Sequence, residues 1–349
     1  MSRCPVFTLN STSKSPDGVS LTTPDKGTVY GSYLYWDGAK WANEERTVHL
    51  GSYAGQKYQN AGAIAIGLSA GYDTQNVNAI AIGSNAGYSF QGQNAVAIGT
   101  NAGYKTQNAN AVAIGAFAGQ NMQSSNAIAV GYCAGQTSQS INAIALGVNA
   151  GNYSQGANSI AVGANAGLDY QGIKCIAIGT SAGGYNQGNN AIAIGANAGA
   201  TSQAPNSIIL NASSTALDAT TTGLFVSSIQ GPRGSSNVLS YDTTTCEVYY
   251  NGSSQRYKYD IKDLSTDTSV IYNLQPRSFK YTISDEPDVG LIAEEAYKCD
   301  PSFAYLDKDQ IPEGIQWNVI TTYLIAEFKK LKTELDELES LICVPNQIN

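Results

Sequence analysis

Residues that bind metals or carry redox chemistry are scarce in this sequence. It contains a single histidine, His49, and six cysteines that are scattered without a CxxC pair. The cysteines stand at Cys4, Cys133, Cys175, Cys246, Cys299 and Cys343. Because no ligands cluster, we expect no metal site and no cofactor, and we expect the thiols to be free. Free thiols fit synthesis in a reducing cytosol.

Charge and long apolar runs are also scarce. Only 13% of the 349 residues are charged, and most of the acidic ones follow Asp260, so the net charge of −8 belongs largely to the C-terminal part. Without a basic patch we expect no nucleic-acid partner. No apolar run approaches the ~20 residues of a spanning helix, and the start, MSRCPVFTLNSTSKSPDG, lacks the apolar core of a signal peptide. We therefore expect no membrane insertion.

One sixteen-residue phrase recurs ten times between His49 and Gln203. A clear copy has the sequence NAIAIGSNAGYSFQGQ. Glycine holds one position of the phrase at Gly51, Gly67, Gly83, Gly99, Gly115, Gly131, Gly147, Gly163, Gly179 and Gly195. A fixed spacing without insertions predicts one structural unit stacked on its neighbours, which is a solenoid.

Each repeat contains one alternating apolar stretch, such as Ala79 to Ile82. Alternation with a period of two predicts a strand with alanines on one face and isoleucines on the other. The remaining residues are mainly Gly, Asn, Gln, Ser and Ala, which are typical of turns, so we expect only small side chains inside the coil. The Ile, Val and Leu face then forms an apolar stripe that its own chain does not cover.

The apolar stripe predicts self-association. Removing apolar surface from water contributes ~25 cal/mol per Å², and monomers rarely expose so long a patch. The simplest solution pairs the stripe with the same stripe on identical chains around an axis. A single-chain left-handed β-helix is the alternative, but it repeats hexapeptides and needs large aliphatic residues on every face, whereas this repeat has one such face.

At the residues xAIAIGxxAG the chain resembles the head repeat of trimeric autotransporter adhesins, and it is similar to the NTAIG-type repeats of viral and phage fibres. The resemblance covers His49 to Gln203 and implies that three chains interlock as a left-handed parallel β-roll. It makes a mainly β fold and a homotrimer the expectation.

A heptad pattern marks the C-terminus from Trp317 onward. Apolar residues are spaced alternately by four and three at Leu324, Phe328, Leu331, Leu335, Leu338 and Ile342. This spacing is that of an a/d seam, and charged residues flank it. We predict a coiled-coil helix over 317–343, ended by Pro345; a core helix inside one domain is the alternative.

The stretch NGSSQRYKYDIKDL, from Asn251 to Leu264, is where we expect chemistry. Ser253 and Lys258 stand five residues apart with Arg256 between them, and NLQPRSFKY and DVGLIAEEA follow downstream. This order resembles the intramolecular chaperone domain of endosialidases and viral tail spikes, a self-cleaving serine peptidase of the Ser–Lys type. The resemblance spans Ser253 to Cys343. It implies that the domain trimerises the fibre, prompts folding of the upstream β-structure and then cuts itself away.

The resemblance also assigns roles. Ser253 would be the nucleophile, Lys258 the general base, and Gly252–Ser253 the scissile bond. A lysine accepts a proton only when its environment disfavours the charged form, and burial at a trimer interface near Arg256 would supply that environment. The family has aspartate after the serine, where this chain has Ser254. Either serine, or neither, would then act, and an inert, retained chaperone is the alternative to a self-cleaving one.

Other columns and pairs are candidates for binding or catalysis. The glutamine column from Gln59 to Gln203 forms either a ligand row or a hydrogen-bonded ladder, and stacked amides favour the ladder. Glu294 and Glu295 form an acid pair, for which we favour a solvated or interface helix face. Tyrosines that suit glycan or protein contacts lie in the variable part of the repeat at Tyr72, Tyr88, Tyr104, Tyr153, Tyr170 and Tyr185.

These patterns divide the chain into four parts. They are an N-terminal cap or attachment segment (1–48), ten β-roll repeats (49–205), a β-rich neck with short strands (206–252) and an α+β chaperone domain (253–349). Tyr33 to Trp41 predicts a hairpin with a type I′ turn at Asp37-Gly38, and we favour tryptophans that plug the open end of the roll over docking on a capsid.

The parts together predict a viral or phage fibre or spike in the virion. It would be structural and would attach to a host surface glycan or protein receptor. A cell-surface trimeric adhesin is the alternative. An enzyme that acts on external substrate is disfavoured, because the repeats lack a carboxylate cluster.

Overall fold

The computed structural model describes residues 13–14, 20–21, 30–227, 229, 239–242, 245–250, 252–282, 285–307 and 309–342. The chain divides into two compact units, Met1–Gly231 and Pro232–Asn349, and each has its own apolar core. Most of the predicted N-terminal segment before Tyr30 lies outside the described residues. Two short strands there, β1 (Ser13–Lys14) and β2 (Ser20–Leu21), pair antiparallel.

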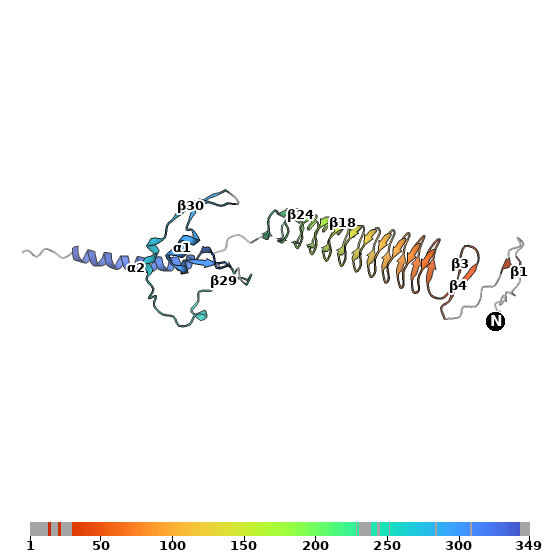
Figure 1. The fold of residues 1–349 in the computed structure, drawn as a ribbon, viewed down its shortest axis with the longest axis horizontal. Coiled ribbons are helices and arrows are strands. Elements are labelled where there is room, and N and C mark those ends of the chain that lie inside the picture. Colours follow the sequence, from red (N-terminus) through yellow and green to blue (C-terminus); the bar gives the residue numbers. More distant parts are fainter. Residues whose placement is uncertain are drawn as a thin grey trace, which may run out of the picture. The chain divides into compact units, whose positions relative to one another are not determined.

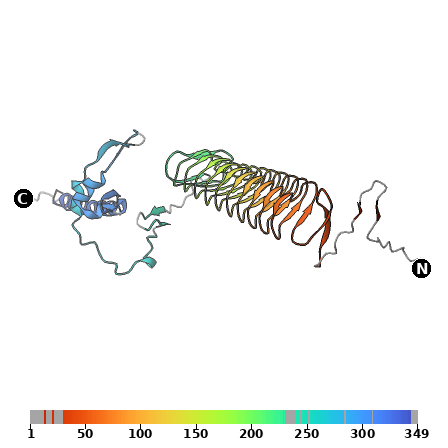
Figure 2. The ribbon, with the colours of Figure 1, turned by 45° about the vertical axis from the view of Figure 1, so that its right-hand side comes forward.

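Two parallel sheets form a solenoid in the first unit (Figures 1 and 2). Strands of the two sheets alternate along the chain, so each coil contributes one strand to each sheet. The twelve-stranded sheet contains β5 (Val48–Leu50), β7 (Ile64–Ile66), β9 (Ile80–Ile82), β11 (Val96–Ile98), β13 (Val112–Ile114), β15 (Ile128–Val130), β17 (Ile144–Leu146), β19 (Ile160–Val162), β21 (Ile176–Ile178), β23 (Ile192–Ile194), β25 (Ser207–Asn211) and β27 (Gly223–Ser227). The eleven-stranded sheet contains β6 (Lys57–Gln59), β8 (Asp73–Gln75), β10 (Ser89–Gln91), β12 (Lys105–Gln107), β14 (Asn121–Gln123), β16 (Thr137–Gln139), β18 (Tyr153–Gln155), β20 (Asp169–Gln171), β22 (Tyr185–Gln187), β24 (Ala198–Gln203) and β26 (Leu217–Ala219). The predicted parallel solenoid is confirmed, and its sheets continue to Ser227, past the last expected repeat.

Alanine and glutamine line the inside of the solenoid. The predicted alanine face is confirmed, since alanines such as Ala81 and Ala97 are fully buried. The expectation that only small side chains fill the coil is wrong, because the glutamines from Gln75 to Gln155 are fully buried as well. The Nε2 of Gln75 donates to the Oε1 of Gln91 at 3.0 Å, and the same bond repeats along the column as far as Gln203. The glutamines from Gln75 to Gln203 therefore form the predicted ladder, which Gln59 does not join. The ladder satisfies most of their buried amide atoms, but the Oε1 of Gln75, at its start, has no hydrogen-bond partner among the described residues.

The turns of each coil depend on left-handed backbone. Gly67 has φ of +127°, and a Cβ there would lie 2.7 Å from the carbonyl oxygen of Gly83 in the next coil, so this column requires glycine. A second left-handed position holds asparagine, as at Asn78 with φ of 58°. The Nδ2 of Asn78 donates to the Oδ1 of Asn94 at 3.3 Å, and this surface ladder continues to Asn158.

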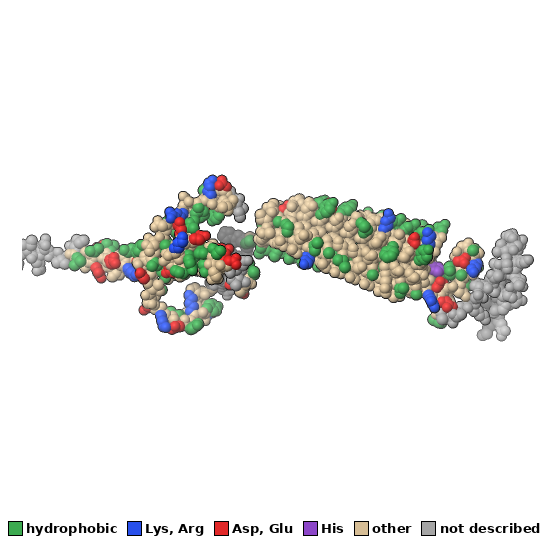
Figure 3. Space-filling model, viewed as in Figure 1, with side chains coloured by type: hydrophobic (Ala, Val, Ile, Leu, Met, Phe, Trp, Pro, Cys, Tyr) green, Lys and Arg blue, Asp and Glu red, His purple; other side chains and the backbone are tan. Residues whose placement is uncertain are grey.

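The outer face of the twelve-stranded sheet carries the apolar stripe. Its strands bury the central alanine and leave the flanking Ile, Val or Leu half-buried or exposed. Ile114 is 38% exposed, and Ile178 and Ile194 are each 40% exposed. The prediction that its own chain leaves this stripe uncovered is confirmed. Few charged groups lie on the visible solenoid surface (Figure 3).

Larger residues close both ends of one interior alanine column. Strand pairing aligns His49 with Ala65 at the first coil and Ile209 with Ala193 at the other end. Ile209 is fully buried, and Phe225 of the final coil packs against the same core. At the first coil the Nδ1 of His49 lies 3.0 Å from the Oε1 of Gln59. The solenoid thus supplies part of its own caps.

A hairpin precedes the first coil, as predicted. It pairs β3 (Tyr33–Trp36) with β4 (Trp41–Glu44). Its turn is not type I′. That turn requires a left-handed φ at both central residues, whereas Gly38 has a φ of +101° and Asp37 does not have a positive φ. The tryptophans do not plug the roll: Trp36 and Trp41 pack on each other and are 55% and 51% exposed.

Tyrosines of this hairpin contact the first coil instead. The ring of Tyr35 lies 4.1 Å from that of His49, measured between centroids. The hydroxyl of Tyr33 accepts from the backbone N–H of His49 at 2.8 Å and donates to the carbonyl of Thr47 at 3.2 Å. Side chains alternate across a strand, so the face that holds Tyr33 and Tyr35 meets the coil and the tryptophan face is left outside.

The second unit combines short strands with helices. Its antiparallel pairs are β28 (Leu239–Tyr241) with β29 (Val248–Tyr250), β30 (Arg277–Lys280) with β31 (Pro287–Gly290), and β32 (Ala304–Leu306) with β33 (Pro312–Ile315). Its helical elements are η1 (Gln255–Tyr257), η2 (Thr268–Asn273), α1 (Ala293–Cys299), η3 (Pro301–Phe303) and α2 (Trp317–Ile342). The predicted C-terminal helix is thus present. In the described part of the chain, no helix combines the length and apolar character that a membrane crossing requires.

The core of the second unit is small. Its buried members are Ile271, Ala296, Phe303, Ile320 and Tyr323. Phe303 is fully buried, and its ring meets that of Tyr323 edge to face at 5.2 Å. The core therefore joins η2, α1 and η3 to the first turns of α2.

Candidate functional site

One tight turn brings Ser253 and Lys258 together. The short helix η1 lies between them, and two backbone bonds close it: Tyr257 N–H donates to the Ser254 carbonyl at 3.0 Å, and Lys258 N–H donates to the Gln255 carbonyl at 3.1 Å. The turn folds the lysine back, so its Nζ donates to the Oγ of Ser253 at 2.9 Å. This distance is that of a nucleophile and its base within hydrogen-bond reach.

The two other predicted members of the site lie in the same turn. The Oγ of Ser254 accepts from the backbone N–H of Arg256 at 3.4 Å, so Ser254 is the N-cap residue of η1. The guanidinium of Arg256 lies over the ring of Tyr257 at 5.3 Å. In the single chain all of these residues are exposed, as is Gly252. The structure brings the predicted residues together but leaves them in contact with solvent.

The helix α2 has two distinct faces. One face packs on the unit's core through Ile320 and Tyr323, and Glu327 continues it. The other carries the predicted heptad seam, whose described side chains are between 52% and 71% exposed at Leu324, Phe328, Leu331, Leu335 and Leu338. The sixth seam residue, Ile342, ends the helix, but its side chain lies outside the described residues. Nothing else in the described part of the second unit covers this seam.

A buried ionic cluster ties α2 to η2. The carboxylate of Glu327, 6% exposed, accepts from the hydroxyl of Thr268 and from the Nζ of Lys330 at 2.6 Å. Lys330 also donates to the Oγ1 of Thr268 at 2.9 Å. These hydrogen bonds, led by that from Lys330, lower the pKa of Glu327 below its usual 4.5. Sequence reasoning missed this cluster, although Ile320, Tyr323 and Glu327 follow the spacing of one helix face.

The acid pair of α1 has a structural partner. Glu295 accepts from the Nε and Nη2 of Arg277 at 2.9 and 3.2 Å, a two-pronged ion pair that joins α1 to β30. This pair lowers the pKa of Glu295, chiefly through the hydrogen bond from Arg277. A carboxylate held ionised by arginine is poorly suited to general acid work, so the exposed ion pair of Glu295 favours a structural role, on a solvated or interface helix face, over an acid–base role.

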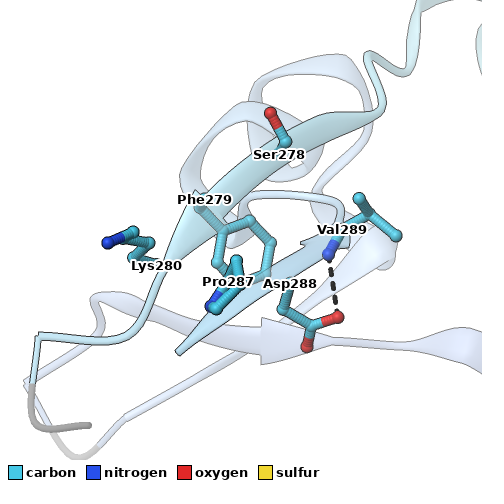
Figure 4. Close-up of a pocket in the computed structure, with 6 residues that line it drawn as sticks. All are labelled: Ser278, Phe279, Lys280, Pro287, Asp288 and Val289. Atoms are coloured by element: carbon cyan, nitrogen blue, oxygen red, sulfur yellow. Dashed lines mark hydrogen bonds between the residues drawn. The ribbon is translucent and has the colours of Figure 1, made fainter. Parts of the chain in front are cut away.

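The hairpin of β30 and β31 carries a shallow surface pocket (Figure 4). Residues of both strands line it, among them Phe279 and Pro287. Asp288 accepts from the backbone N–H of Val289 at 2.8 Å, as the dashed line in Figure 4 marks. The lining brings together no nucleophile with a base, and Val289 is 76% exposed. We assign this pocket no chemistry.

The six tyrosines singled out in the sequence fall into two groups. The rings of Tyr72, Tyr88 and Tyr104 stack on one another with centroids 4.9 Å apart. The stack covers both faces of Tyr88 and one face each of Tyr72 and Tyr104. Lys57 and Lys105 lie over these two end rings at 5.3 and 5.9 Å, so little ring face is left for a ligand. The second group, Tyr153, Tyr170 and Tyr185, is 49%, 62% and 49% exposed. These rings are better placed for contact with another molecule.

A parallel solenoid with an uncovered apolar stripe, followed by a small unit that ends in a long two-faced helix, defines a fibre-like protein with a C-terminal assembly domain. Residues 253–305 match the family described as the chaperone of endosialidase. The match begins at Ser253, the residue that Lys258 contacts. Neither the curated proteins nor the solved structures contain a match to the chain.

The family match and the solenoid fit a tail-fibre-like protein that carries a C-terminal chaperone domain. The chaperone family implies trimeric self-association and points to phage tail proteins. The exposed seam of α2 and the stripe of the solenoid are both surfaces on which identical chains can pair.

Proposed function

We propose that the protein is a homotrimeric fibre or spike of a virus or phage, whose C-terminal domain drives trimerisation and folding and then removes itself by cutting the Gly252–Ser253 bond. The contact that carries the proposal is the 2.9 Å hydrogen bond from Lys258 to Ser253, at the start of the segment that matches the chaperone family. The solenoid is the shaft of the fibre.

Trimerisation rests on two apolar surfaces in different units. The stripe of the solenoid and the seam of α2 each run along a regular element, and each chain leaves its own copy exposed. Burial of both against identical chains removes apolar surface from water at ~25 cal/mol per Å². Light scattering of the full chain held intact by Ser253→Ala, at micromolar concentration, tests this, and we expect three times the chain mass. A soluble monomer with an intact β signal would contradict it.

The cleavage is a rearrangement followed by hydrolysis. The Oγ of Ser253 attacks the carbonyl carbon of Gly252, and Lys258 accepts the hydroxyl proton. The C–N bond breaks, the proton passes to the α-amine of Ser253, and the amide becomes an ester. Water then hydrolyses the ester, which leaves a carboxylate on Gly252 and a free amine and hydroxyl on Ser253. Gly252 has no side chain to obstruct the attack.

Assembly supplies what the single chain lacks. The hydrogen bond between Lys258 and Ser253 forms within one chain, but both residues are exposed. Burial at a trimer interface would remove water from both residues, and desolvation disfavours the charged form of a lysine. Cleavage therefore follows trimerisation, and the chaperone is released only after the shaft has assembled.

Intact mass spectrometry of the purified full chain tests the cut. We expect a C-terminal fragment that begins at Ser253, and we expect Ser253→Ala and Lys258→Ala to leave the chain whole. The matched control is Lys262→Ala, because Lys262 is an exposed lysine that pairs with Asp260 instead. Trimers of wild-type chain that stay uncut would support an inert, retained chaperone.

Attachment to a host is the remaining part of the proposal. The exposed group Tyr153, Tyr170 and Tyr185 is the candidate surface for a glycan or protein receptor, and the N-terminal segment is the candidate for docking on a capsid. Immunolabelling of virus particles and of cell envelopes distinguishes a virion fibre from a cell-surface adhesin. Label confined to particles is the expected result.

A further inference from the structure

The turn between Ser253 and Lys258 depends on few interactions. It is a single 3₁₀ turn of three residues, none of which is buried, so packing does not hold it. Its two backbone bonds and the side-chain cap from Ser254 are the contacts that close it. Turns of this kind are marginal in water, so loss of one contact changes the fraction of time that Lys258 lies against Ser253.

We infer that Ser254 is a positioning residue, whose hydroxyl caps η1 and so holds Lys258 on Ser253 of the same chain. This inference rests on the proposed self-cleavage. Ser254 has extended backbone, with φ of −64° and ψ of 143°, and its Oγ accepts from the N–H two residues on, which is the geometry of an N-cap. Serine and aspartate are comparable caps, so a serine can serve where the family has aspartate.

The same geometry separates the two neighbouring serines. Lys258 donates to Ser253, whereas the Oγ of Ser254 is directed to the backbone N–H of Arg256. The nucleophile is therefore Ser253, and the hydroxyl of Ser254 takes no part in bond making. Any residue with a short side-chain acceptor can replace Ser254, whereas Ser253 can be replaced only by a residue that is itself a nucleophile.

The cleavage rate of the full-length trimer tests the assignment. Loss of a cap typically costs about 1 kcal/mol, which corresponds to about a five-fold slower reaction. We expect Ser254→Ala to cut about five-fold more slowly at the same bond, and Ser254→Asn to restore the rate without adding charge. The pH profile of the rate keeps its shape in both variants, because a cap transfers no proton. The matched control is Ser265→Ala, an exposed serine outside the turn.

A second measurement is independent of cleavage. In chains held intact by Ser253→Ala, amide hydrogen exchange over residues 252–262 reports how often the turn opens. We expect Ser254→Ala to lower protection there by at most about five-fold and Ser254→Asn to restore it. Unchanged protection and an unchanged cleavage rate in Ser254→Ala would overturn the inference, as would a fragment that begins at Ser254. If protection changes as expected in the Ser253→Ala chains, but trimers that keep Ser253 never cut, the cap is sustained and the proposed cleavage is rejected.

Discussion

The solenoid and the C-terminal unit bury polar groups in different ways. Inside the solenoid the buried glutamines from Gln75 to Gln203 each bond to the equivalent glutamine sixteen residues away. In the second unit the buried carboxylate of Glu327 bonds to Thr268, which lies 59 residues earlier. Repetition makes the first arrangement local in sequence, whereas the second requires a long loop to close.

The two regions also differ in the interactions that stabilise them, but both leave an apolar surface exposed. The solenoid has a continuous interior with few surface charges, while the second unit has a small core and ion pairs such as Arg277 with Glu295. Both nevertheless expose a straight apolar row. Under the proposed function both rows are buried on assembly, and the C-terminal unit, which has the smaller core of its own, gains more stability from that burial than the shaft does.

Substitution of Phe303 is expected to cause the largest difference in stability between the two regions. Replacement by alanine removes the one fully buried aromatic ring of the described C-terminal core and costs about 3–5 kcal/mol there. Hydrogen exchange resolved along the chain, in the Ser253→Ala background, checks it. Protection falls in the second unit and is unchanged in the solenoid. Tyr305→Ala is the control, since Tyr305 is 45% exposed. Equal loss in both units would show that they unfold together.

A glycine substitution destabilises the solenoid instead of the second unit. Gly131 has φ of +132°, and an added Cβ would lie 2.5 Å from the carbonyl oxygen of Gly147. We expect Gly131→Ala to cost about 1–3 kcal/mol from backbone strain, with the contact adding to it. Thermal unfolding followed by the β signal checks this. Thr180→Ala, at an exposed turn position, is the control. A variant as stable as the control would mean that the coils can separate.

Sequence reasoning predicted more of the structure where the chain repeats than where it does not, although it missed the burial of the glutamines inside the repeats. The buried face of Ala81 follows from period-two alternation, and the glutamine ladder follows from identical residues at one spacing. Alternation also shows that the hairpin has two faces, but nothing local determines which face meets the first coil. Tyr35 covers His49 and Trp36 stays outside. That choice depends on the shape of a surface formed by other residues.

The candidate site divides in the same way. The pairing of Lys258 with Ser253 was predictable from the resemblance to the chaperone family, although the spacing of five residues alone is weak evidence for it. The role of Ser254 was not, since the side chain of a serine beside another serine has no preferred partner in sequence. Burial of Glu327 was also unforeseen, because its partner Thr268 belongs to a distant segment.

A moderate effect is expected inside the glutamine ladder. Gln139→Ala leaves the amides of Gln123 and Gln155 each without one partner in a dry interior, at a cost of about 1–2 kcal/mol. Gln136→Ala is the control: it removes the same side chain from a partly buried position, where water replaces the bond to Gln120. Chemical denaturation of both variants gives the comparison. Equal midpoints would show that water reaches the interior amides.

The smallest effect is expected from protonation of Glu327 at low pH. It lowers the stability of the second unit and leaves the solenoid unchanged. Its hydrogen bonds lower its pKa below 4.5, so the folded second unit binds this proton less readily than the unfolded chain does. The ionised carboxylate therefore stabilises the unit above pH 4.5, and this contribution disappears as pH falls through the folded-state pKa. Glu327→Gln lowers the unfolding temperature at pH 7, and its difference from wild type narrows in acid. Glu334→Gln, an exposed glutamate of the same helix, is the control. A difference that is constant with pH would mean that packing of the side chain, and not its charge, ties α2 to η2.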